Sequence, residues 1–143
     1  MITEDYVSFE TAKLLKEKGF DEPCKVWYSE YTSQFNGKKY NSLEFDDCNR
    51  FNVGYKFLFY VPTLQMAMKW LREVHKIGIF TSSWLVTNAG RTFERHPYGT
   101  SIVSLVGEHD LLCNDILEKE TYEEAVEAAL KYCLNHLIDV KTT

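Results

Sequence analysis

The sequence predicts an α+β domain in which three amphipathic helices alternate with aromatic-rich strands. Three segments carry apolar residues at helical spacing, and each begins with a Ser or Thr that can cap a helix. The segments between them alternate apolar and polar residues, as half-buried strands do. The predicted order is α-β-β-β-α-β-β-α, a mainly antiparallel sheet of about five strands with helices on one face.

The chain is long enough for a single domain, residues 1–143, with its own core. It has 143 residues, of which 45% are apolar and 15% aromatic, and this composition excludes a disordered chain. The first helix is expected from the N-cap Ser8 to Gly19, where glycine is typical of a helix stop.

A β-hairpin is predicted next. Residues 25–35 and 38–45 flank Asn36-Gly37, a pair that suits a two-residue type I′ turn. This turn would place Tyr31 opposite Ser42. Residues 53–61 alternate most cleanly, so they are expected to form a central strand.

A second helix is expected from the cap Thr63 to about Lys76. Its predicted inward stripe consists of Leu64, Ala67, Met68, Leu71 and Val74, with Trp70 at the margin. Residues 77–87 and 101–106 are predicted as strands, with a turn at 88–91 and a short helix at 111–119.

The last helix begins at Thr121, where Glu124 completes a capping-box pattern. Its inward positions are Ala125, Val126, Ala129, Cys133 and Leu137. Glu127 and Lys131 are expected on its outer face, four residues apart in the order that favours an ion pair.

The distribution of charge and the spacing of the cysteines limit the classes of partner and cofactor that the sequence predicts. From Glu108 onward there are nine acids and three bases, a net charge of −6, against +1 before it, giving −5 in total. This distribution disfavours nucleic acid as a partner. The four cysteines are scattered, no metal or cofactor motif occurs, and reduced thiols are expected. No apolar run matches a signal peptide or a membrane span, so a cytoplasmic protein is predicted.

The first candidate site is an aromatic face of the hairpin. Tyr31, Phe35 and Tyr40 alternate with serines, a mixture typical of adaptable binding surfaces. Two interpretations stay open: another layer of the fold covers these side chains, or they contact a protein partner or a second copy.

The second candidate site is the loop around Arg91, Arg95 and His96. Two arginines and a histidine can hold an anion or move a proton. Their spacing specifies no reaction, and a solvated loop is the simpler explanation, so a non-enzymatic role is favoured. No metal-ligand set accompanies them.

Three segments resemble one protein family. Residues 5–20 (DYVSFETAKLLKEKGF), 62–75 (PTLQMAMKWLREVH) and 121–132 (TYEEAVEAALKY) resemble a family of short uncharacterised proteins encoded by gut Bacteroidales and their phages or mobile elements. The resemblance implies an origin in a prophage or mobile element, but no activity and no functional residues.

The sequence therefore predicts a small accessory or regulatory protein of a mobile element that acts through protein–protein contacts. The alternative is a small-molecule-binding protein or enzyme that uses the loop around Arg91, Arg95 and His96. The partner, the oligomeric state and the strand order stay open.

Overall fold

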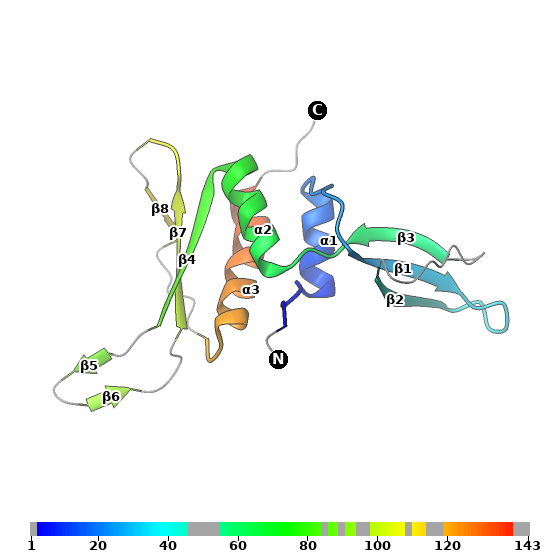
Figure 1. The fold of residues 1–143 in the computed structure, drawn as a ribbon, viewed down its shortest axis with the longest axis horizontal. Coiled ribbons are helices and arrows are strands. Elements are labelled where there is room, and N and C mark those ends of the chain that lie inside the picture. The colour runs from blue at the N-terminus through cyan, green and yellow to red at the C-terminus, as the bar shows by residue number, and fades with distance from the viewer. Residues whose placement is uncertain are drawn as a thin grey trace.

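A computed structural model of the chain describes residues 3–45, 55–83, 86–88, 91–93, 98–107, 110–113 and 119–138. The described part is an α+β fold with three helices and antiparallel strands, as predicted. The helices are α1 (Phe9–Glu17), α2 (Leu64–Trp70) and α3 (Tyr122–Tyr132), and they lie between two sheets (Figure 1).

The described strands form two three-stranded sheets and a two-stranded ribbon. One sheet has the order β2-β1-β3, and its strands are β1 (Val26–Thr32), β2 (Lys39–Phe45) and β3 (Tyr55–Tyr60). The other has the order β4-β7-β8, made of β4 (Ile77–Ser83), β7 (Tyr98–Ser104) and β8 (Leu111–Cys113). The ribbon pairs β5 (Val86–Asn88) with β6 (Arg91–Phe93).

The prediction of one sheet of about five strands was wrong. Helix α2 follows β3 and leads the chain to the opposite side of the helical layer, where β4 begins a new sheet (Figure 1). Helix α3 packs on β4 and β7, and the turn that follows α2, Leu71–His75, contacts β4, whereas α1 contacts both α3 and β3. The alternation of apolar residues identifies strands, but it carries no information about which sheet a strand joins.

Helix α1 begins and ends through local hydrogen bonds that its sequence specifies. The Ser8 side chain accepts from the Thr11 amide at 3.2 Å. At the other end Gly19 has φ +100°, the Phe20 amide donates to the Leu15 carbonyl at 2.8 Å, and the Gly19 amide donates to the Lys16 carbonyl at 3.2 Å. These two bonds form a Schellman motif, and Phe20 and Leu15 are both buried beneath it.

Helices α2 and α3 begin with the same kind of N-cap and end in the same kind of turn. Thr63 accepts from the Met66 amide and Thr121 from the Glu124 amide, each at 3.1 Å. Both helices then widen into a π-helical turn, at Leu71–His75 and at Cys133–Leu137.

The π-helical turn changes which side chains of α2 face inward. Trp70 is buried, whereas Val74, predicted on the inward stripe, is half exposed. A wide turn holds more residues than an α-turn, so the stripe predicted at 3.6-residue spacing no longer fits beyond Leu71.

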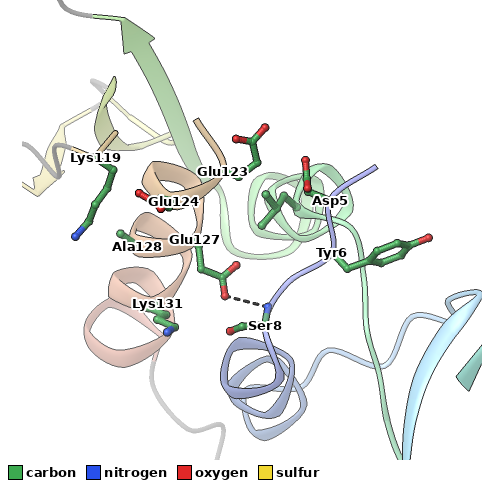
Figure 2. A pocket seen from close by; sticks show the side chains of 10 residues that line it. Asp5, Tyr6, Ser8, Lys119, Glu123, Glu124, Glu127, Ala128 and Lys131 are labelled. Atoms are coloured by element: carbon green, nitrogen blue, oxygen red, sulfur yellow. Dashed lines mark hydrogen bonds between the residues drawn. The ribbon is translucent and has the colours of Figure 1, made fainter. Parts of the chain in front are cut away.

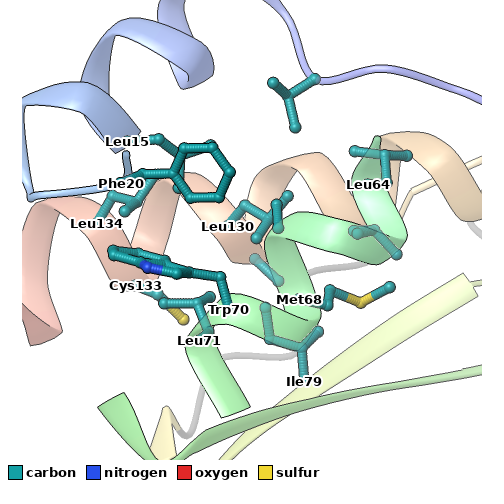
Figure 3. Packing of buried hydrophobic residues seen from close by; sticks show 14 of the residues in the cluster. Leu15, Phe20, Leu64, Met68, Trp70, Leu71, Ile79, Leu130, Cys133 and Leu134 are labelled. Carbon is teal, nitrogen blue, oxygen red and sulfur yellow. The ribbon is translucent and has the colours of Figure 1, made fainter. Parts of the chain in front are cut away.

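The core gathers between the three helices and the inner face of β4 and β7. Phe20 meets Trp70 edge to face, with ring centroids 5.5 Å apart (Figure 3). Leu15, Leu130 and Leu134 are fully buried around this pair (Figure 3). One apolar cluster runs from α1 through α2 and α3 to Ile79 and Ile102 of the sheet, so the helices and both sheets share a core.

The hairpin forms, but with a different turn and register from those predicted. Tyr31 lies opposite Tyr40, two residues from the predicted partner Ser42. The Ser33 amide donates to the Lys38 carbonyl at 2.8 Å, so the four residues 34–37 make the loop. Of these four only Gly37 has positive φ, whereas a type I′ turn needs positive φ at two residues. Because the register differs by two residues, the side chains of Val26–Thr32 and Lys39–Phe45 keep their predicted faces. Phe35, predicted at the end of the first strand, lies in the loop instead.

Strand β3 is an edge strand of its three-stranded sheet, and the prediction of a central strand was wrong. Tyr28 pairs with Phe59 and Ser29 with Phe57, which leaves Leu58 as the extra residue of a β-bulge. Residues 53 and 54 lie outside the described part.

The predicted short helix at 111–119 was also wrong where the structure describes it. Residues 111–113 form β8, which pairs with β7 at Val103 and Ile102. Leu111, Leu112 and Cys113 are compatible with either structure, and pairing with the β7 edge decides in favour of the strand. Residues 114–118 lie outside the described part.

Candidate functional site

The sheet β2-β1-β3, which we call the arm, projects away from the helices (Figure 1). Helix α1 packs on one of its two faces. The Phe9 ring lies 4.9 Å from the Tyr28 ring and 5.4 Å from the Phe59 ring, measured between centroids. These contacts attach the base of the arm to the core.

The opposite face of the arm, which we call the aromatic face, includes the side chains of Trp27, Tyr31, Tyr40, Phe57 and Tyr60. Tyr31 is partly buried, and Tyr40 is 50% exposed. Phe57 is 47% exposed and meets Tyr60 edge to face at 4.9 Å. Large half-exposed aromatic side chains of this kind are typical of protein-binding surfaces.

A carboxylate lies among these aromatic side chains. Glu44 Oε1 accepts from Ser42 Oγ at 3.0 Å and from Ser29 Oγ at 3.4 Å. Ser29 lies between Trp27 and Tyr31 on this face of β1, and its side chain is buried. The neighbouring rings and Glu44 therefore enclose it. The two hydroxyl groups orient the carboxylate, which can accept a hydrogen bond from a partner.

The tip of the arm presents Phe35 to solvent. Its side chain is 100% exposed, and the loop that carries it is held by its own hydrogen bonds. The Phe35 amide donates to Ser33 Oγ at 3.2 Å, and the Lys38 amide donates to Asn36 Oδ1 at 2.9 Å. Asn36 Nδ2 also donates to the Tyr40 hydroxyl at 3.1 Å, which ties the tip to the aromatic face.

The structure thus places Tyr31 and Tyr40 side by side and Phe35 beyond them at the tip. Phe57, Tyr60 and Glu44 also belong to this surface, although they were not among the predicted site residues. The sequence does contain a signal for an apolar surface on both faces of this strand, the run of large apolar residues 57–60. Four such residues in succession cannot all point to one face of a strictly alternating strand.

The second predicted site cannot be assembled from the described residues. Arg91 begins β6, where only its backbone is described, and Arg95 and His96 lie outside the described residues. Anion or small-molecule binding by these three residues stays a prediction.

A groove of about 550 Å³ lies between α3 and the segment that leads into α1 (Figure 2). Asp5, Glu123 and Glu124 line it, together with Lys119 and Lys131.

Glu127 also lines this groove, and its carboxylate is used within the fold. Its Oε1 accepts from the Ser8 amide at 3.0 Å (Figure 2) and from the Thr11 hydroxyl. Lys131 pairs with Glu10 of α1 at 3.3 Å, so the predicted ion pair between Glu127 and Lys131 is replaced by two contacts between helices. These groups join α3 to α1.

Cys24 lacks the properties of a catalytic nucleophile. Burial, and secondarily the charge of Glu22, raises the pKa of its thiol to about 11. The reactive form of cysteine is the thiolate, which is scarce at neutral pH when the pKa is this high.

Within the described residues, no group of three or more His, Cys, Asp or Glu side chains could hold a metal ion. No helix in this part of the chain is long and apolar enough to cross a membrane. Comparison of the chain with protein-family models, curated proteins and solved structures finds no match.

Proposed function

We propose that the protein is a binding module whose arm docks onto another protein, as an accessory or regulatory factor of a mobile element acting in the cytoplasm. The observation that carries this proposal is the fully exposed Phe35 at the end of a hydrogen-bonded loop. A large apolar side chain in water gains about 1.5–3 kcal/mol when it becomes fully buried, so Phe35 is suited to enter an apolar pocket.

The loop supports this role because it is already ordered. The backbone on both sides of Phe35 is fixed, because the Phe35 amide donates to Ser33 Oγ and the Lys38 amide donates to Asn36 Oδ1. An anchor held in one conformation loses less entropy on binding than a flexible one. Anchors of this kind commonly dominate the binding energy of an interface.

The aromatic face supplies the surface around the anchor. Tyr40 is linked to the loop through Asn36, and Tyr31 lies directly opposite Tyr40. Farther along, Glu44 offers an acceptor for an Arg, Lys or amide donor of the partner. The partner is therefore expected to present an apolar pocket with a hydrogen-bond donor beside it.

Site-specific photo-crosslinking tests this proposal. Benzoylphenylalanine at position 35 is expected to capture one protein from nuclease-treated lysate of the native host. The same amino acid at the exposed Glu17 of α1, away from the arm, is the matched control.

The captured protein is then purified and its affinity for wild-type protein and for two variants is measured. Phe35→Ala is expected to weaken binding by at least tenfold, and Glu44→Gln by less. Equal capture at positions 17 and 35, or an unchanged affinity of Phe35→Ala, would refute docking through the tip.

A further inference from the structure

Among the described residues no strand pairs with the outer edge of β2, which presents a regular row of backbone groups. In an antiparallel pair, residues whose amide and carbonyl bond to the partner alternate with residues whose groups point away. Ser33 bonds to Lys38, so the pairs of Tyr31 with Tyr40 and of Ser29 with Ser42 are also hydrogen-bonded. The remaining β2 residues direct their amide and carbonyl groups away from β1; they are Lys39, Asn41, Leu43 and Phe45.

These outward-directed residues are all exposed, and two of them are large and apolar. Leu43 is 39% exposed and Phe45 is 45% exposed. A long apolar edge strand normally pairs with another strand unless proline, a bulge or charged residues prevent it. Strand β2 contains no proline, and its register with β1 shows no shift. Its two charged side chains already have partners within the arm, because Lys39 pairs with Glu30 at 3.4 Å and Glu44 accepts from Ser42 and Ser29.

The other edge of the arm is less suitable for pairing. Strand β3 carries the bulge at Leu58, which interrupts its ladder with β1. A bulge bends and twists its strand, and proteins use bulges to protect sheet edges. The free edge of β2 is therefore the edge at which a further strand can be added.

We propose that β2 pairs with β2 of a second copy of this chain, antiparallel, around a two-fold axis at Ser42. This register pairs all seven residues of β2, with Lys39 opposite Phe45 and Asn41 opposite Leu43 of the other copy. The residues in both of these pairs direct their backbone groups outward, as the new ladder requires.

The side chains of β2 are compatible with this symmetric pairing. No two like charges face each other, because Lys39 lies opposite Phe45 and Glu44 lies opposite Tyr40. The two Leu43 side chains become diagonal neighbours across the axis. Self-complementarity over the whole strand favours a second copy over an unrelated peptide as the occupant.

The dimer has a consequence for the arm. A two-fold axis perpendicular to the sheet puts both aromatic faces on the same side of a six-stranded sheet. The two Phe35 tips then point in opposite directions, because the paired strands are antiparallel. The dimer does not depend on the proposed docking function, and it would make that docking bivalent.

Disulfide cross-linking tests the register. Ser42 would lie opposite itself as a non-hydrogen-bonded pair, with Cα atoms about 4.5 Å apart, within the range that a disulfide spans. Ser42→Cys, with Cys24, Cys48 and Cys113 replaced by serine, is expected to form a covalent dimer under mild oxidation. Tyr40→Cys in the same background is the matched control, because its two copies would lie about 14 Å apart.

Sedimentation velocity over a range of concentrations tests the dimer without new cysteines. The wild-type chain is expected to dimerise reversibly, and Leu43→Lys, which places two ammonium groups across the axis, is expected to raise the dimer dissociation constant at least tenfold. Circular dichroism verifies that the variant is folded. A wild-type chain that stays monomeric at the highest concentration, or equal cross-linking of the two cysteine variants, would overturn the proposal.

Discussion

Replacing Glu127 with alanine tests how α1 is held to α3. The Glu127 carboxylate is the acceptor for the Ser8 amide, which lies at the beginning of α1, and for the Thr11 hydroxyl in its first turn. Thr11 is fully buried, so its hydroxyl cannot turn to water when the carboxylate is removed.

The expected destabilisation follows from these two bonds. A hydrogen bond to a charged group contributes about 1.5–3 kcal/mol. The two bonds share one oxygen atom and Glu127 is only partly buried, so their energies do not add fully. We expect Glu127→Ala to lower the free energy of unfolding by about 2–3 kcal/mol, and the melting midpoint by about 6–15 °C.

Urea denaturation with a double-mutant cycle measures this effect. Thr11→Val keeps the shape of the side chain and removes its hydroxyl, and the coupling energy between positions 11 and 127 is expected to be about 1 kcal/mol or more. Glu123→Ala is the matched control, since Glu123 is an exposed acid on the same helix. A loss below about 0.5 kcal/mol for Glu127→Ala, or no coupling to Thr11, would show that these bonds do not hold the helices together.

Three further predictions concern single residues. Because its pKa is raised to about 11, Cys24 is expected to react with iodoacetamide about 100-fold more slowly at pH 8 than a thiol of pKa 9.0. The reaction rate, measured by mass spectrometry, is expected to rise about tenfold for each pH unit up to pH 10. A rate that levels off near pH 9 would contradict this pKa. Gly19→Ala is expected to lower the free energy of unfolding by about 1–2 kcal/mol in urea, because φ is +100° there, and no loss would exclude strain at this position. Phe59→Ala in the core is expected to destabilise by about 3–5 kcal/mol, whereas Phe35→Ala changes stability by less than about 0.5 kcal/mol; a large loss for Phe35→Ala would mean that the tip is needed for folding.

The helix beginnings could be predicted from the sequence because they depend on a few adjacent residues. Ser8, Thr63 and Thr121 each accept a hydrogen bond from the amide three residues later, as their sequence positions indicate. The helix end at Gly19 is equally local. It depends on the positive φ of Gly19 and on the two hydrogen bonds of the Schellman motif, which join residues at most five positions apart.

The arrangement of the strands could not be predicted in the same way. Sheet membership depends on which strands the helices separate, and this is decided by contacts between residues far apart in the chain, such as those of α1 with α3. The role of Glu127 is a similar case. Its spacing from Lys131 predicted a local ion pair, whereas Ser8 and Thr11, more than 110 residues away, hold its carboxylate.

The aromatic face depends on one inserted residue. In an unbulged strand Phe57 and Phe59 would share a face, as the sequence alternation suggested. The extra residue Leu58 separates them, so that Phe59 packs on Phe9 in the core and Phe57 lies with Tyr60 on the opposite face. The same bulge leaves β3 less suited to pairing, which makes β2 the open edge of the arm. The binding surface and the edge proposed for dimerisation thus have a common structural origin, an irregularity that periodic patterns cannot reveal.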